Sequence, residues 1–483
     1  MPYFLKEFKM KAVYRKLTGM FFALMFASAS VVCVGCSDGG SDGGSPAATP
    51  ATPGSKGGDE KGDGGQGGDG KNPSAKKINL SDAPVGYASV NAAYTVSGTK
   101  TIVKTRDELN SALKNGGIIV IDGMIDMSDG MLPAAGSTSL TSTSKLDEFV
   151  HSTKSNYTNY ADWVDKYTKA CSKTTEDGKL NATYNSTLYS ELWLLNREYG
   201  NKISLKIKEG TTLVGKSAGC GIRGGSIQIN GDNIQIRNLT IQDACDPFPH
   251  HEQKNSTTSD GYNAQWDGVN IDNHKNIWID HCTFEDTLTL GEVKTGTTGT
   301  LEEKWQIYDG LCDIKGGSTN ITVSNCIFKN HDKTMLIGSD DSDGDNTKRF
   351  VTLYGNYFDN CGQRLPMVRN TTIHIFNNYY KTEETPYKST SAVNARKNAI
   401  VYAENNYFGV GLKYSFNANS GDTTPVLHSS GNEGESVNKT GNITSADSAL
   451  FSSLNKYTYT SVTASDAKTS VLANAGAGCT LAD

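Results

Sequence analysis

The chain has 483 residues, enough for one large repetitive domain or for about two to three ordinary ones. Its net charge of −6 is small for this length, so no nucleic-acid partner is predicted, and an acidic ligand would need a local basic cluster. A hydrophobic content of 36 % with 51 glycines and 22 tyrosines is low for a layered α/β enzyme and suits a wall of stacked coils.

The first residues read as an export signal. A basic stretch precedes an apolar run over residues 17–34, which predicts a secretory signal over residues 1–36. Residues 33–36 (Cys-Val-Gly-Cys) resemble a bacterial lipobox, which would make Cys36 the lipidated first residue of the mature protein. We expect the protein to be attached by this lipid to the outer membrane or cell surface, or to be secreted after plain cleavage nearby. A membrane-spanning anchor is disfavoured because the run is short and ends in cysteine.

Residues 37–77 are mostly Gly, Ser, Asp, Pro and Lys, with almost no apolar side chain. Such a segment cannot bury enough surface to offset the entropy lost on ordering, so we expect a disordered tether. The functional domain is then predicted over residues 78–483.

Two of the ten cysteines lie in the leader. The others could form disulfides in an exported protein, but the sequence does not choose among the pairings. No paired CxxC or histidine motif indicates a zinc site. These eight cysteines are Cys171, Cys220, Cys245, Cys282, Cys312, Cys326, Cys361 and Cys479.

The first elements of the domain differ from the rest. Residues 106–114 predict a short amphipathic helix with Leu109 and Leu113 on one side, leading into a buried strand over 117–122. We expect this helix to cap one open end of the fold. Residues 132–200 lack the periodicity found later and are interpreted as an insertion over one face. Residues from Gly431 onward are placed only as a C-terminal extension.

One pattern then recurs, with a short β-prone strand, a polar bend at Asn, Gly or His, and a second strand start. Its six copies span residues 233–241, 276–284, 320–328, 350–358, 372–380 and 400–408. Alternation places side chains such as Ile277 and Ile279 on one face, and stacking the copies would bury a continuous core. The sequence therefore predicts an all-β solenoid, a parallel β-helix. A β-sandwich is disfavoured because its usual hairpin turns do not recur.

The bends of these copies carry asparagines. Asn238, Asn325, Asn377 and Asn405 occupy the same position in the pattern. We expect their amide side chains to form hydrogen bonds up and down a column.

Acidic residues gather on neighbouring predicted coils. Aligning Trp266-Asp267-Gly268-Val269 with Tyr308-Asp309-Gly310-Leu311 predicts that Asp267 and Asp309 are neighbours about 4.8 Å apart. Asp313 follows four residues later and returns to the same face. Three carboxylates repel one another, so the patch needs a cation or raised pKa values, and Ca²⁺ suits oxygen ligands. The alternative is that these aspartates cap turns or pair with basic side chains.

The next coils carry the opposite charge. Lys333, Arg364 and Arg369 come from consecutive predicted strands beside the acidic patch. Positive side chains beside a bound cation suit a polyanion whose carboxylates both would bind. A face of salt bridges between Arg and Asp is the alternative.

Four motifs in order carry a family resemblance. They are Asn276-Ile-Trp-Ile-Asp-His-Cys-Thr-Phe284, Asp309-Gly-Leu-Cys-Asp313, His331-Asp-Lys-Thr-Met-Leu-Ile-Gly-Ser339 and Gln363-Arg-Leu-Pro-Met-Val-Arg369. The chain thereby resembles pectate lyases of polysaccharide lyase family 1, most clearly from Trp266 to Tyr380. The resemblance implies a right-handed parallel β-helix that cleaves polygalacturonate by β-elimination and uses Ca²⁺. A monomer is expected by analogy alone.

Roles follow from the matched positions. The resemblance implies Asp267, Asp309 and Asp313 as calcium ligands. It implies Arg364 as the base that removes the C5 proton of a galacturonate. Lys333 and Arg369 would hold substrate carboxylates.

Other matched residues are assigned no chemistry. Asp280 and His281 are expected to form hydrogen bonds within the wall. Gln265 stands where some members of the family have an acidic residue, which would weaken calcium binding, and Asn370-Thr371 stand near a common glycine.

Elimination by a neutral guanidine predicts an alkaline activity optimum, because arginine is otherwise permanently charged. A pectin lyase would share Arg364 but act on methylated substrate without calcium, and the intact aspartate set argues against it. A polygalacturonase-like hydrolase would need its own aspartate motifs, which the sequence does not show. A non-catalytic pectin-binding β-helix or adhesin has no reason to keep three cations beside three aspartates.

Overall fold

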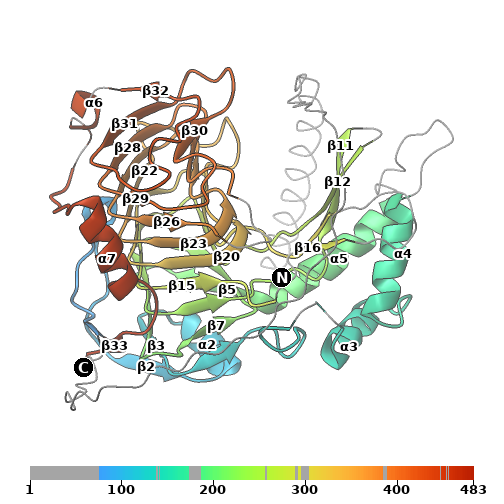
Figure 1. Cartoon of the computed structure of the whole chain (residues 1–483). Helices are drawn as coiled ribbons and strands as arrows, with labels where there is room; N and C mark the ends of the chain where they lie inside the picture. Colours follow the sequence, from blue (N-terminus) through green and yellow to red (C-terminus); the bar gives the residue numbers. More distant parts are fainter. Residues whose placement is uncertain are drawn as a thin grey trace, which may run out of the picture. The chain divides into compact units, whose positions relative to one another are not determined.

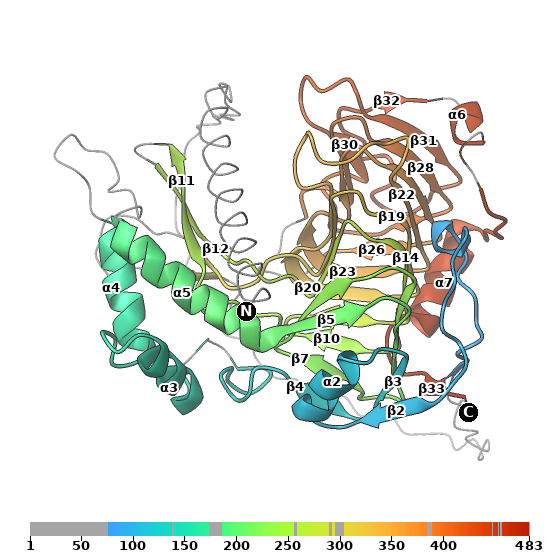
Figure 2. The same cartoon turned by 180° about the vertical axis from the view of Figure 1, so that it is seen from behind.

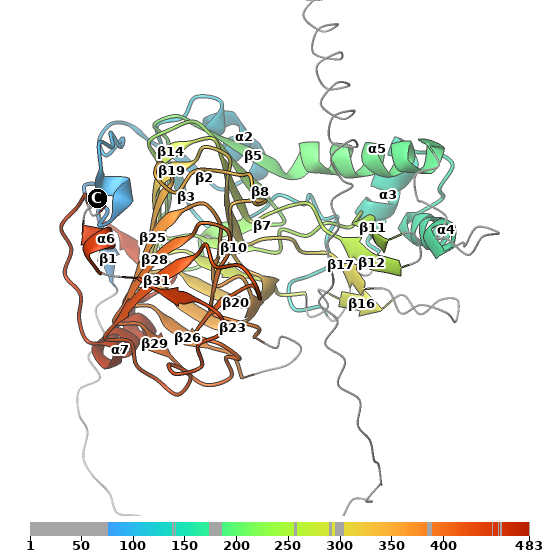
Figure 3. The ribbon, with the colours of Figure 1, turned by 90° about the horizontal axis from the view of Figure 1, so that it is seen from above.

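The computed structural model describes residues 76–482 except 138–139, 141, 173–185, 256–257, 289–291, 295–303, 384–388, 447, 453 and 455. The signal predicted over residues 1–36, its Cys36 and nearly all of the tether lie outside the described residues. Within those described, three long parallel sheets stack strand upon strand (Figure 1). Seen from above, they surround a common interior (Figure 3).

Each complete coil contributes one strand to each sheet, and the β2–β32 sheet has additional strands at its two ends. The β2–β32 sheet contains β2 (Lys100–Val103), β3 (Ile118–Ile121), β6 (Thr212–Gly215), β9 (Ile234–Arg237), β14 (Lys275–Asp280), β19 (Thr319–Ser324), β22 (Phe350–Tyr354), β25 (Thr372–Phe376), β28 (Ile400–Glu404), β31 (Val426–Ser430) and β32 (Thr444–Ser445). The β4–β29 sheet contains β4 (Met124–Asp126), β7 (Gly221–Arg223), β10 (Thr240–Gln242), β15 (Thr283–Glu285), β20 (Ile327–Lys333), β23 (Tyr357–Gln363), β26 (Tyr379–Lys381) and β29 (Tyr407–Phe408). The β5–β30 sheet contains β5 (Ser204–Lys208), β8 (Ser226–Asn230), β13 (Val269–Asp272), β18 (Cys312–Lys315), β21 (Leu336–Ile337), β24 (Met367–Val368), β27 (Val393–Ala395) and β30 (Phe416–Ala418).

The six repeated segments stack in the predicted register. Ile277 of β14 lies between Ile234 and Ile321 of the adjacent coils, and all three are fully buried. Aromatic rings at the ends of the copies form a second column, with centroids 4.8–5.1 Å apart from Phe284 to Phe408. Since each strand buries its apolar face only against its neighbours, the coils share one core. The predicted parallel β-helix is confirmed.

The predicted position of the asparagine column is wrong by one residue in each coil. Asn238, Asn325, Asn377 and Asn405 do occupy one bend, each in the left-handed backbone region with φ of 51–54°. Their side chains, however, do not form the ladder. The stacked amides belong to the next residue of each coil, Asn356, Asn378, Asn406 and Asn432, which are linked at 2.9–3.0 Å. The residue after the bend points inward, where its buried amide bonds to the coils above and below and, at Asn378 and Asn406, also to a carbonyl of its own coil.

A helix covers the first coils, as predicted. α2 (Arg106–Leu113) begins with a capping box between Thr105 and Glu108 and buries Leu109 and Leu113 against the core cluster of the coils. Figure 2 shows it beside β2 and β3, at the end of the stack. The helix therefore excludes water from the open end of the solenoid.

The segment predicted as an insertion is mostly helical. It contains α3 (Ser144–Thr153), α4 (Tyr160–Ser172) and α5 (Ser186–Ile203). A four-stranded sheet joins it, made of β11 (His250–Asn255), β12 (Thr258–Asn263), β17 (Lys304–Gln306) and β16 (Glu292–Lys294). The two parts share an apolar cluster separate from that of the coils, with Trp163 packed edge-on against Phe248 at 4.9 Å. The insertion thus stands to one side of the coils on its own core (Figures 1 and 3).

Both ends of the domain run along the outside of the coils. Near the start, η1 (Tyr87–Ser89) crosses the outer face of the β2–β32 sheet, where the amides of Tyr87 and Ala88 donate to Thr352 and Thr322. The predicted C-terminal extension contains α6 (Ser448–Ser452) and α7 (Ala464–Asn474) and returns to the first coils. There β33 (Thr480–Leu481) pairs with β1 (Lys77–Ile78).

The bend asparagines bind this returning segment. Asn238 accepts from the amide of Cys479 at 2.9 Å and donates to its carbonyl at 2.7 Å. Asn377 donates to the carbonyl of Val462 and accepts from its amide. Asn405 donates to the hydroxyl of Ser461 at 2.8 Å. Three of the bend asparagines therefore hold the C-terminal segment, and Asn377 also donates to the backbone carbonyl of Asn405 at 3.1 Å.

The eight cysteines of the domain are all buried. Seven of them are free thiols in this structure, namely Cys220, Cys245, Cys282, Cys312, Cys326, Cys361 and Cys479. Within residues 76–482 as described, no helix combines the length and the apolar character needed to span a bilayer.

Candidate active site

The predicted site residues lie where successive coils enter or leave the β5–β30 sheet. Asp267 precedes β13, and Asp313 lies in β18. Lys333 ends β20, Arg364 follows β23 directly, and Arg369 follows β24 directly. Because the coils stack in register, these side chains come from adjacent levels of the same region.

The aspartates are brought together, but in a different register from the predicted one. β13 pairs with β18 so that Asn270 lies opposite Asp313, which places Asp267 opposite Gly310 instead of Asp309. A Cβ atom on Gly310 would lie 2.3 Å from Asp313 Oδ1 and 2.9 Å from Asp267 Oδ1. Glycine at this position therefore lets the two carboxylates approach each other.

Lys315 lies between these two carboxylates, a contact that the sequence argument missed. Its Nζ is 2.7 Å from Asp267 Oδ2 and 3.1 Å from Asp313 Oδ2. The sequence does contain a signal for this contact, because Lys315 is two residues after Asp313 and strand alternation returns it to the same face.

One ammonium does not offset the burial and mutual repulsion of these carboxyls. Burial, with the charges of Asp313 and Asp309, raises the pKa of Asp267 to about 8 although Lys315 opposes it. Burial and Asp309 also raise the pKa of Asp313 against Lys315 and Arg364. Burial lowers the pKa of Lys315, but the carboxylates outweigh it and hold that pKa above the ordinary value. With both carboxyls ionised, their charge exceeds that of Lys315, so the patch favours the uptake of a proton or of a further cation.

Asp309 faces Lys333 instead of the other two aspartates. Lys333 Nζ is 3.2 Å from Asp309 Oδ1 and also contacts Asn263 Oδ1 of β12. His331 fixes the same loop, with Nε2 2.6 Å from the Asp309 carbonyl and Nδ1 2.6 Å from Asp286. Asn263 thus connects the β11–β16 sheet to a predicted site lysine.

Arg364 has an unusual backbone conformation. Its φ of 61° lies in the left-handed region, and every other non-glycine residue found there in the described part of the chain is Asn, Asp or His. Its guanidinium lowers the pKa of Asp313, so the two groups lie near each other. Its Nε is buried and has no hydrogen-bond partner among the described residues. A strained residue with an unused buried donor is typical of a functional position.

Two further side chains complete the basic side of the site. Arg369 Nε donates to Asp341 Oδ1 at 3.1 Å, and its Nη1 donates to the Gly338 carbonyl. Arg396, directly after β27, lies one coil beyond Arg369. Burial and Arg369 lower the pKa of Arg396. Neither Asp341 nor Arg396 was predicted, because Asp341 lies in a loop without periodicity and Arg396 lies outside the four motifs.

The donor set at this patch fits a calcium ion. Asp267 and Asp313 each direct one oxygen toward the same cation, Lys315 Nζ, and carboxylate oxygens are the ligands that calcium prefers. Asp309 would have to turn from Lys333 to join them. Across the residues that the structure describes, no group of three or more His, Cys, Asp or Glu side chains already converges as a metal site. The ligand roles of the three aspartates therefore stay a prediction.

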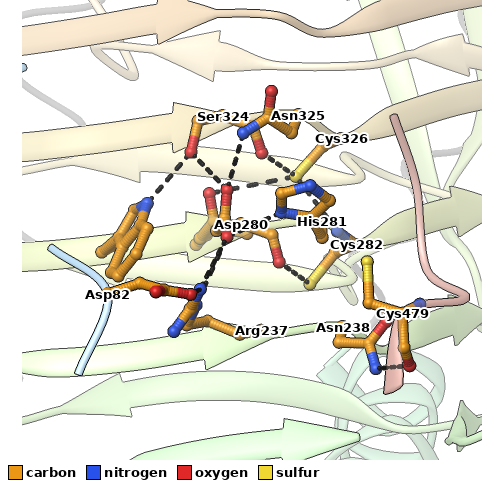
Figure 4. Close-up of polar contacts among 12 residues, drawn as sticks. Asp82, Arg237, Asn238, Asp280, His281, Cys282, Ser324, Asn325, Cys326 and Cys479 are labelled. Carbon is orange, nitrogen blue, oxygen red and sulfur yellow. Dashed lines mark hydrogen bonds and ion pairs between the residues drawn. The ribbon is translucent and has the colours of Figure 1, made fainter. Parts of the chain in front are cut away.

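The wall of the coils contains a separate charged network (Figure 4). Asp280 Oδ2 is 3.2 Å from Arg237 Nη2 and 2.8 Å from His281 Nδ1, while its Oδ1 accepts from Ser324 and Asn325. Burial acts to raise the pKa of Asp280, but His281 and Arg237 hold it below the ordinary value. Asp280 and His281 therefore form hydrogen bonds within the wall, as expected.

The stacked coils identify the protein as a parallel β-helix, and solved structures of pectate lyases share this fold. A pectate lyase of Acidovorax avenae subsp citrulli superimposes with a TM-score of 0.67 over 86 % of this chain and 99 % of its own, at 21 % identity, which supports the fold alone. A pectate lyase bound to a hexasaccharide has a TM-score of 0.64 over 82 % of this chain and 96 % of its own, at 26 % identity.

Residues 198–480, more than half of the chain, match the family model described as pectate lyase. The chain belongs to this pectate lyase family. It is 36 % identical over 212 residues to a pectate lyase of Bacillus subtilis, covering 43 % of this chain and 50 % of that protein. It is 40 % identical over 179 residues to pectate lyase E of Dickeya chrysanthemi, covering 36 % and 44 %. The chain thus spans about half of the length of these curated relatives.

Proposed function

We propose that this protein cleaves polygalacturonate, a (1→4)-α-D-galacturonan, by calcium-dependent β-elimination. The products are 4,5-unsaturated oligogalacturonides, and the role is pectin degradation. Family membership and the named activity of its relatives support the reaction class. The observation that carries the proposal is Arg364, which is held at φ 61° with a buried, unused Nε beside the acidic patch.

The arrangement of charges suits this chemistry. Arg369 and Arg396 lie on adjacent coils, so the carboxylates of a polyanion running along the coils would meet a guanidinium at successive levels. Lys333 lies at the end of β20, one coil before Arg364. These cations would stabilise the negative charge that develops on a galacturonate when its C5 proton is removed.

Arg364 is assigned the proton abstraction. Its guanidine must be deprotonated to accept the C5 proton. The electron pair of the C5–H bond then forms the C4=C5 double bond, the C4–O bond breaks, and the leaving glycosidic oxygen takes a proton from water. Bound calcium would supply a fixed positive charge beside the substrate carboxylate. Asp267, Asp309 and Asp313 are the residues that would hold it.

The test is the ultraviolet absorbance of the unsaturated product during incubation with polygalacturonate. We expect a rise that requires added calcium, stops with a chelator and is fastest at alkaline pH. A calcium-independent rise on methylated pectin would instead indicate a pectin lyase. Reducing ends that appear without the unsaturated product would indicate a hydrolase, and binding without cleavage would indicate an adhesin.

We also propose that the protein is exported and lipid-anchored through Cys36. The lipobox-like residues 33–36 and the Gly-rich segment after them support this location. Expressed in a bacterial host with labelled fatty acid, the wild type should incorporate the label and fractionate with membranes, whereas Cys36→Ser should do neither. Equal labelling of both proteins would contradict the anchor.

A further inference from the structure

Lys315 and the two buried aspartates form a contact that has no part in the proposed elimination. In each carboxylate, one oxygen accepts from a backbone amide and the other faces the lysine. Asp267 Oδ1 accepts from the Gly310 amide, and Asp313 Oδ1 accepts from the Leu336 amide, both at 2.9 Å. The remaining oxygen of each faces Lys315 Nζ.

We infer that Lys315 is an exchangeable internal cation that occupies the calcium position and leaves it when calcium binds. This inference rests on the proposed function, because it takes Asp267 and Asp313 as calcium ligands. Two cations cannot occupy the space between the same pair of oxygens, since their mutual repulsion is large at contact distance. Calcium binding is therefore an exchange that breaks two ammonium–carboxylate contacts.

The side chain of Lys315 can move, whereas its carboxylate partners are held in place. Its side chain is 25 % exposed, whereas those of Asp267 and Asp313 are 5 % and 2 % exposed. The lysine has a flexible four-carbon stem that can swing toward solvent, and the aspartates are held by backbone amides. The carboxylates therefore stay in position during the exchange.

The exchange couples calcium binding to the binding of an anionic substrate. A displaced ammonium at this face gains a new partner when a chain of carboxylates is bound along the coils. Calcium binding is then more favourable with polygalacturonate present than without it, and by linkage calcium strengthens substrate binding by the same factor.

A fixed clamp is the opposite possibility, and it predicts the opposite sign. If Lys315 only holds the two carboxylates in place for the metal, its removal loosens the site and weakens calcium binding. If Lys315 competes with calcium, its removal tightens binding. The sign of one measured change therefore separates the two roles.

The experiment is a calorimetric titration of calcium into the wild type, Lys315→Met and Arg396→Met without substrate. We expect Lys315→Met to bind calcium at least about tenfold more tightly, because the competing charge-assisted contact is gone. Arg396→Met removes one positive charge three coils further along the same sheet and should change the affinity by less than about twofold, since that charge lies beyond screening distance.

The outcomes separate the exchange from the proposed function. Equal or weaker binding by Lys315→Met overturns the exchange but leaves the calcium requirement intact. No binding by any of the three proteins overturns the calcium requirement and the exchange together.

A second measurement uses the wild type, because Lys315→Met leaves two buried carboxylates without their cation. Acetylation of surface amines is followed by mass spectrometry with and without calcium. Lys315 should react severalfold faster with calcium, and Lys329, which pairs with Glu285 at 2.5 Å on the β4–β29 sheet, should react at an unchanged rate. No change at Lys315 on calcium saturation overturns the exchange.

Discussion

Replacing Arg364 by glycine is expected to abolish turnover of polygalacturonate without destabilising the protein. The loss of a positioned base lowers kcat by about 10²- to 10⁴-fold. Glycine adopts the φ of 61° found at this position without the steric penalty that arginine bears. The free energy of unfolding should therefore stay the same or rise by about 1 kcal/mol.

The two measurements are the initial rate of unsaturated product formation with calcium and a denaturant unfolding curve. Arg364→Lys should remain nearly as slow as the glycine variant, because an ammonium lacks the planar fork of the guanidine. Lys329→Met, on the wall of the β4–β29 sheet, should retain the wild-type rate. An Arg364→Gly protein that is less stable and still active would show that Arg364 supports the fold and is not the base.

Replacing Asp280 by alanine is expected to cause the largest loss of stability. Arg237 is 1 % exposed and stacks over Trp278 at 4.2 Å, so it cannot turn toward water when its buried partner is removed. Removing one member of a buried ion pair costs about 3–5 kcal/mol because the other charge stays buried. The free energy of unfolding from denaturant curves should fall by about that amount.

Asp82→Ala provides the matched control, since Asp82 pairs with the same Nη2 of Arg237 at 3.0 Å but is 38 % exposed. Its loss should cost about 1 kcal/mol or less. The pH dependence gives a second check. The native pKa of Asp280 lies below the ordinary value, so its stabilisation is fully present above that value and is lost as the pH falls through the native pKa. Equal losses for Asp280→Ala and Asp82→Ala would contradict a buried ion pair.

Periodicity was sufficient to predict the solenoid and the register of its six copies. Ile234, Ile277 and Ile321 align as written because a shift by one residue would move every apolar side chain out of the core. Polar positions at bends carry no such penalty. The asparagine ladder was therefore assigned to Asn377 instead of Asn378, and Asp309 was placed opposite Asp267 where Gly310 lies.

The sequence predicted that the candidate site residues lie in one region, but it did not predict their contacts. Motif spacing places Asp267, Arg364 and Lys333 on neighbouring coils, but it does not show which carboxylate a flexible lysine will contact. Lys315 contacts both carboxylates that calcium was expected to bridge, while Lys333 pairs with Asp309. The contact of Lys333 with Asn263 depends on how the β11–β16 sheet packs beside the coils, and no local pattern encodes that.

The pairing of β33 with β1 changes how such a stack of coils can open. A simple solenoid frays from its ends, because each coil contacts only its neighbours and the terminal coil has one neighbour fewer. Here the segment that leaves the last coil returns along Asn405, Asn377 and Asn238 and completes a sheet with the first residues of the domain. Detaching the last coil therefore breaks contacts at the first, so the two ends are linked into one cooperative unit and the loop of chain is closed without a covalent bond.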